Sequence, residues 1–270
     1  MNSIIYGPVP SWRLGKSLGI DLLCAQGKIC SFNCVYCQLG RTTNLTTRRR
    51  EFVSIARLTE ELEGVKGIAA DYVTFSGTGE PTLASNLGQA IDVARAILHL
   101  PVAVLTNSSL ISREDVVDAL VKADVVVAKL DAHNQELFEQ VNRPMSDITL
   151  ADIIEGIRHF KSEFTGKLCL QIMFIEANKI FAESIAQMAS SLSPDEVQLN
   201  TPLRPCAVKP VTPSQMASIK GKFAKLRNVV TVYESSRPEV VPLNLQETLR
   251  RRPKLCHCER SEAISHVKSE

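Results

Sequence analysis

The chain has 270 residues, 44% of them hydrophobic and 22% charged, which is enough to bury one large domain or two small ones. That composition excludes a disordered chain, and a net charge of +2 points to no strongly acidic or basic partner. No stretch approaches the roughly 20 apolar residues of a membrane helix. The first ten residues also lack the regions of a signal peptide. We therefore expect a cytoplasmic protein without membrane association.

Short apolar and β-branched runs alternate with amphipathic segments along the chain. We expect strands at residues 18–23, 72–75, 102–105, 125–130, 168–175 and 197–199, with a seventh at 229–233. Helical stripes lie between them, as in Leu87, Ile91, Ala94 and Leu98. Repeated βα units build a parallel sheet whose chemistry lies at the carboxyl ends of the strands. The pattern predicts an α/β fold of about six βα units and does not by itself separate an incomplete TIM-type barrel, which we expect, from an open doubly wound sheet.

Hydrophobic periodicity ends near residue 249. We expect residues 1–249 to form a catalytic core with an N-terminal extension, and residues 250–270 to form a polar tail with little order. Cys256 and Cys258 in this tail are too close in sequence to build a metal site alone, so no function is predicted for them. A role for Cys206 stays open.

Three of the eight cysteines, Cys30, Cys34 and Cys37, lie within eight residues just after the first predicted strand. Thiols stay reduced in the cytosol, so this group indicates metal or redox chemistry. Three thiolates can hold three irons of a 4Fe-4S cluster and leave the fourth iron open to a small molecule. The alternative is a zinc site completed by a cysteine such as Cys24, but the C-x3-C spacing is wider than in zinc knuckles. The spacing favours the cluster.

The C-x3-C-x2-C spacing, with Tyr36 before the last cysteine, resembles the signature of the radical S-adenosylmethionine (SAM) superfamily. Gly77, Thr78, Gly79 and Glu80 follow the second predicted strand, where that superfamily has a glycine-rich motif for the methionine amino group. The resemblance implies a 4Fe-4S cluster and SAM as cofactors. It also implies cleavage of SAM to a 5'-deoxyadenosyl radical that abstracts hydrogen from a substrate. The glycines let backbone approach the ligand, and Glu80 would hold its ammonium.

Polar residues end the next predicted strands. Asn107 follows the third strand and Asp131 the fourth, where the family places groups near the ribose and carboxylate of SAM. Lys129 and Gln171 occupy comparable positions in the fourth and fifth strands. Each is equally explained as a turn or capping residue. No residue is assigned a catalytic role beyond cofactor binding.

Short sequence segments that begin at Tyr6, Cys37 and Asn200 resemble a radical SAM group related to the wyosine tRNA-base synthases. The resemblance covers about residues 4–245. This likeness suggests a tRNA base as substrate, with a peptide segment or a small metabolite as alternatives. We also expect a low-potential electron donor of the flavodoxin or ferredoxin type. The basic runs at 48–50 and 250–252 are candidate phosphate contacts, and a solvated surface loop is the favoured interpretation of each. Two alternatives remain: an activase that generates a radical on a partner protein, and a non-catalytic zinc or electron-transfer module.

Overall fold

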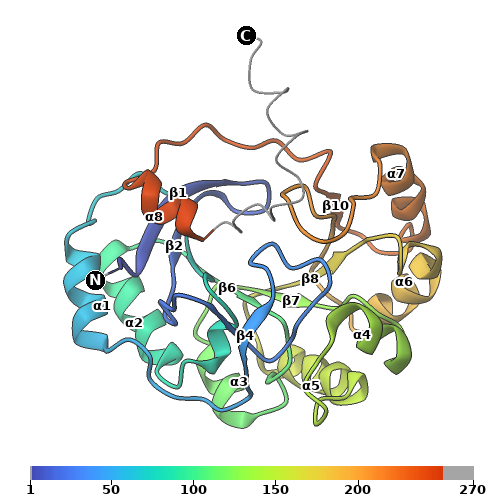
Figure 1. Cartoon of the computed structure of the whole chain (residues 1–270), viewed down its shortest axis with the longest axis horizontal. Helices are drawn as coiled ribbons and strands as arrows, with labels where there is room; N and C mark the ends of the chain where they lie inside the picture. The colour runs from blue at the N-terminus through green and yellow to red at the C-terminus, as the bar shows by residue number, and fades with distance from the viewer. Residues whose placement is uncertain (1, 252–270) are drawn as a thin grey trace.

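A curved sheet with helices along its outer side forms the body of the protein, in a computed structural model that describes residues 2–251 (Figure 1). Eight strands join in the order β1, β2, β5, β6, β7, β8, β9, β10, so β1 and β10 are its edges. These strands are β1 (Ile5–Ser11), β2 (Gly15–Ile20), β5 (Tyr72–Phe75), β6 (Val102–Thr106), β7 (Val125–Lys129), β8 (Lys167–Met173), β9 (Glu196–Asn200) and β10 (Val229–Thr231). The α-helices are α1 (Ile55–Glu63), α2 (Leu87–Leu98), α3 (Glu114–Leu120), α4 (Gln135–Asn142), α5 (Leu150–Glu163), α6 (Ala182–Ser191), α7 (Pro213–Lys222) and α8 (Leu245–Arg250). The predicted partial barrel is confirmed.

The strands from β2 to β10 run parallel, and β1 pairs antiparallel with β2. A separate two-stranded sheet joins β3 (Lys28–Cys30) to β4 (Thr42–Leu45). The prediction included neither the β1 hairpin nor this small sheet. Because the carboxyl ends of parallel strands meet at one edge, the residues that follow them gather there.

The two faces of the sheet bury different side chains. Val104, Val126 and Leu170 point outward into the main core against the helices. On the inner face, Val127 and Cys169 belong to a second, smaller apolar group. Apolar side chains thus cover both faces of these strands, which explains their nearly continuous apolar runs.

The last described helix closes against the first strand. Helix α8 contacts β1, and Arg251, directly after it, is 5% exposed. Structure therefore extends past residue 249, and Arg251 is a buried residue rather than a surface phosphate contact. Residues 252–270, with Cys256 and Cys258, lie outside the described part of the chain.

Candidate functional site

The cysteine loop begins at the end of β3 and is held on the end of α4. Cys30 is the last residue of β3, and Cys34 and Cys37 follow in a tight loop in which the Cys37 amide donates to the Cys34 carbonyl at 3.1 Å. The amide of Val35 donates to the carbonyl of Val141 in α4 at 3.0 Å. These backbone bonds fix the loop on the scaffold, independently of the thiols.

Hydrogen-bond donors surround two of the three sulfurs. Asn107 Nδ2 lies 3.4 Å from Cys30 Sγ, and Asn142 Nδ2 lies 3.6 Å from Cys34 Sγ. Burial raises the pKa of Cys30 to about 12, and the charge of the nearby Lys28 opposes this. Burial also raises the pKa of Cys34. Amide donors and a buried cation suit sulfurs that carry negative charge as ligands.

The three thiols of the loop do not converge on one point in the described part of the chain. Among residues 2–251, no three His, Cys, Asp or Glu side chains come close enough to one another to hold one metal ion. The thiolates that hold a 4Fe-4S cluster lie further apart than those that hold one ion, since each thiolate binds a different iron. Cys24 is turned away, with its sulfur 3.5 Å from the Asn2 carbonyl, so it completes no zinc site with the loop.

The glycine-rich motif pairs directly with the strand that carries the first cysteine. The Ile29 amide donates to the Thr78 carbonyl at 3.1 Å, and the Glu80 amide donates to the Ile29 carbonyl at 3.1 Å. A Cβ at Gly79 would lie 1.6 Å from Ile29 O, so a glycine is required. At Gly77, where φ is +137°, a Cβ would lie 2.3 Å from the carboxyl carbon of Asp21. The fold thereby joins two motifs that are far apart in sequence.

Glu80 is buried, and its carboxylate is surrounded by the protein's own donors. Its Oε1 accepts from the Thr82 and Thr106 hydroxyls at 2.8 and 2.7 Å. Its Oε2 accepts from the backbone N–H of Asn107 at 2.7 Å. Burial raises its pKa, and these bonds oppose the rise. Glu80 thus fixes the turn that carries Asn107, whose side chain also donates to Ser31 Oγ at 2.9 Å.

Asp131 is hydrogen-bonded to Tyr36, the tyrosine that precedes the last cysteine of the loop. One of its oxygens accepts from the Tyr36 hydroxyl and, at 2.8 Å, from Asn142 Nδ2. The other accepts from the Met173 amide at 2.7 Å and lies 3.1 Å from Lys129 Nζ. Asp131 is 3% exposed, so this network joins the cysteine loop to the carboxyl ends of β7 and β8.

Sequence reasoning missed Asp21, Lys28 and Asn142. Asp21 accepts from the Thr78 hydroxyl at 3.1 Å, beneath the glycine-rich motif. Asn142 ends α4 and reaches both Cys34 and Asp131. A single aspartate or asparagine at the end of an element carries no sequence signal that separates this role from ordinary capping.

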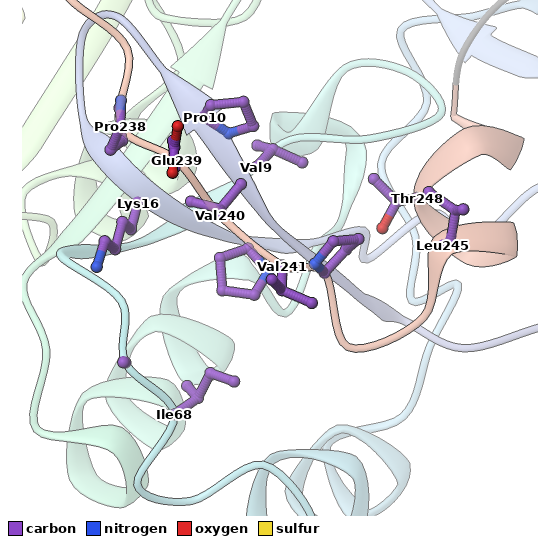
Figure 2. Close-up of a pocket in the computed structure, with 13 residues that line it drawn as sticks. Val9, Pro10, Lys16, Ile68, Pro238, Glu239, Val240, Val241, Leu245 and Thr248 are labelled. Atoms are coloured by element: carbon purple, nitrogen blue, oxygen red, sulfur yellow. The ribbon is translucent and has the colours of Figure 1, made fainter.

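A groove of about 840 Å³ lies elsewhere, between the β1 hairpin and residues 238–242 (Figure 2). Its lining is mostly apolar and includes Val9, Val241 and Leu245. None of the cysteines of the loop and none of the glycine-rich motif lines it. The groove is therefore separate from the site described above.

The chain belongs to the radical SAM superfamily, whose family profile matches residues 26–179. It is therefore an enzyme that uses SAM and a 4Fe-4S cluster. It is 40% identical over 235 residues to a UPF0026 protein of Methanocaldococcus jannaschii, with 84% of this chain and 72% of that one covered. A UPF0026 protein of Synechocystis is 41% identical over 202 residues, covering 74% and 76%.

Solved structures share the fold at low identity. A structure of TYW1 with a lysine-pyruvate adduct bound superposes with a TM-score of 0.59 at 13% identity, covering 77% of this chain and 73% of that one. A structure of anSMEcpe with bound AdoMet gives 0.61 at 15% identity, covering 80% and 64%. Neither likeness extends beyond the fold. Within residues 2–251, no helix combines the length and the apolar character needed to cross a bilayer.

Proposed function

We propose that Cys30, Cys34 and Cys37 hold the 4Fe-4S cluster of this enzyme. The observation that carries the proposal is the pairing of β3 with the glycine-rich motif, which puts the cysteine loop beside Gly77 to Glu80. The donor set fits the group, because three thiols of one short loop have amide donors directed at two of their sulfurs.

Six residues are proposed to bind SAM at the same edge of the barrel. They are Gly77, Thr78, Gly79, Glu80, Asn107 and Asp131. When bound, the cluster and SAM supply a 5'-deoxyadenosyl radical able to remove hydrogen from a substrate. The backbone of the glycine-rich motif lets the cofactor approach closely, Glu80 keeps Asn107 in place, and Asp131 keeps Tyr36 and the cysteine loop in place. Residues 1–249 form the catalytic core in this proposal.

The proposed substrate is a base of tRNA, and the proposed electron donor is a flavodoxin or ferredoxin of the cytoplasm. The resemblance of the segments at Tyr6, Cys37 and Asn200 to the wyosine tRNA-base synthases supports a tRNA base. Arg41, Arg48 and Arg143, on and beside the cysteine loop, are exposed. Such side chains suit contacts with phosphates.

The test is anaerobic reconstitution with iron and sulfide, reduction with dithionite in the presence of SAM, and mass spectrometry of 5'-deoxyadenosine. We expect product from the wild type and none from Cys30→Ala, Cys34→Ala or Cys37→Ala. Cys24→Ala is the matched control and keeps activity, because Cys24 faces the chain terminus. Activity that persists in a loop variant with full iron content contradicts the ligand assignment.

A further inference from the structure

Three polar side chains form a row on the inner face of the sheet. Lys129 of β7 is the register partner of Gln171 in β8, and Gln171 is the partner of Gln198 in β9. Side chains alternate along a strand, and Val127 and Cys169 of the same alternation belong to the inner apolar group. The row therefore faces inward, one step further toward the carboxyl ends than this group.

One member of the row, Lys129, contacts Asp131, which is one of the proposed SAM residues. Lys129 is two residues before Asp131 in the chain, and its Nζ lies 3.1 Å from Asp131 Oδ1. In the next row toward the carboxyl ends, the Met173 amide donates to the same carboxylate. A molecule bound at the row would thus lie next to Asp131, one of the residues proposed to bind SAM.

Two buried atoms of this row have no hydrogen-bond partner among the described residues. Gln171 is 8% exposed and Gln198 is 1% exposed, yet Gln171 Nε2 and Gln198 Oε1 are both without a partner. Gln198 Nε2 donates to Glu196 Oε1 at 2.7 Å, which fixes the orientation of its amide and directs the carbonyl oxygen elsewhere. Buried polar atoms without partners destabilise a fold, so a pair of them on neighbouring strands points to a bound ligand.

We propose that Gln171 and Gln198 bind the substrate through a planar heterocyclic edge that carries an acceptor beside an N–H donor, as nucleobases do. The inference rests on the function proposed above and names the part of the substrate that is recognised. Gln171 donates to the acceptor and Gln198 accepts from the N–H. A single glutamine amide binds the edge of adenine through one donor and one acceptor, and here the same two contacts come from two amides.

The donor of Gln171 and the acceptor of Gln198 match the edge of a heterocyclic ring better than they match a peptide main chain. A trans peptide bond directs its N–H and its carbonyl to opposite sides, so it offers no adjacent donor and acceptor of one amide. A nucleobase offers both on one edge. The source of that base, a free nucleoside or a residue of RNA, is decided by the experiment.

The experiment measures equilibrium binding to the reconstituted holoenzyme with SAM present. The probes are the four ribonucleosides, 3-methyluridine, 1-methylguanosine and a mixture of cellular tRNAs. We compare the wild type with Gln171→Leu and Gln198→Leu, which keep the volume of the side chain and remove its polar atoms. Gln89→Leu is the matched control, because Gln89 is exposed on α2 on the outer side of the barrel.

We expect wild-type and Gln89→Leu enzymes to bind one nucleoside, or tRNA, and each inner-face variant to bind it about tenfold more weakly or worse. If the bound nucleoside is uridine or guanosine, N-methylation at its edge weakens binding to a similar extent. The thermal unfolding midpoint of Gln171→Leu stays equal to the wild type or rises, because leucine removes a buried atom without a partner. Binding of a nucleoside identifies the substrate as a free metabolite. Binding of tRNA alone identifies it as a base within RNA.

Three results overturn the inference. They are absence of binding by any probe, equal binding by the leucine variants, and loss of SAM affinity that matches the loss of probe affinity, which would assign the pair to the adenine of SAM. Formation of 5'-deoxyadenosine is measured in the same preparations. If it continues in any of these cases, the proposed function stands without this substrate assignment. If SAM is never cleaved, the proposed function fails, and the binding data still decide whether the pair reads a base.

Discussion

Arg251 and Asp21 form a buried ion pair across nearly the whole length of the chain. Arg251 Nε lies 3.2 Å from Asp21 Oδ2, and the two side chains are 4% and 1% exposed. Arg251 also donates to the carbonyl of Ser3 at 2.7 Å, and its guanidinium lies over the ring of Tyr6 at 4.4 Å. Because Asp21 also accepts from Thr78, the end of the described chain supports the glycine-rich motif.

Replacing Arg251 with methionine should lower the free energy of unfolding by about 3–5 kcal/mol, since it leaves the buried Asp21 carboxylate without its cation. Chemical denaturation of the apo-protein measures this. Arg158→Met is the matched control, because Arg158 is half exposed in its pair with Glu155, and it should cost no more than about 1 kcal/mol. Equal small losses in both variants would show that Arg251 does not stabilise the described fold.

Gly79→Ala should destabilise the protein by about 1–3 kcal/mol or more, because its Cβ would meet the carbonyl of Ile29 and force β3 and the motif apart. Iron loading should fall as well, since Cys30 follows Ile29. Gly221→Ala is the control: its Cβ meets nothing within 4 Å, and alanine in helix α7 should stabilise by up to about 1 kcal/mol. Unfolding midpoints and iron content of both variants test the prediction, which is contradicted if Gly79→Ala behaves as Gly221→Ala does.

Glu80→Ala should weaken SAM binding while iron content stays largely intact. The reason is that Glu80 holds Thr106 and Asn107 in place and contacts no cysteine sulfur directly. Equilibrium dialysis with SAM and an iron assay separate the two effects. The exposed carboxylate Glu114, at the start of α3, supplies the control Glu114→Ala. Unchanged SAM affinity in Glu80→Ala would remove this residue from the cofactor site.

Tyr36→Phe should speed the loss of iron to a chelator several-fold, with a stability cost of about 1–3 kcal/mol, because Asp131 loses a donor that connects it to the cysteine loop. Time courses of cluster bleaching at fixed chelator concentration measure the rate. Tyr233→Phe removes a hydroxyl that donates to the Val211 carbonyl at 2.7 Å and makes no hydrogen bond to Asp131, so it should leave the rate unchanged. Identical rates in both variants would mean that Asp131 does not hold the loop through Tyr36.

Sequence patterns located the strands from β5 to β10 well and the edge formed by β1 and β2 poorly. The predicted strand at residues 72–75 coincides with β5, because an apolar run between helices has few other conformations. Strand β1 was missed because Pro8 and Pro10 argue against a strand, yet both are tolerated at an edge. The first predicted strand began late, since β2 starts with polar residues such as Ser17, whose hydroxyl bonds Thr74 Oγ1 at 2.7 Å on the inner face.

The sequence by itself determined the repeated βα units of the fold and indicated the cysteine and glycine motifs, because both depend on residues close together in the chain. The tertiary structure alone decided which distant side chains meet. Asp21 and Arg251 are 230 positions apart, and Asn142 and Cys34 are 108 apart. Likewise, the row of Lys129, Gln171 and Gln198 exists only through the register of three strands. Hydrogen bonds and ion pairs depend on distances of a few ångströms, which spacing along a chain does not specify.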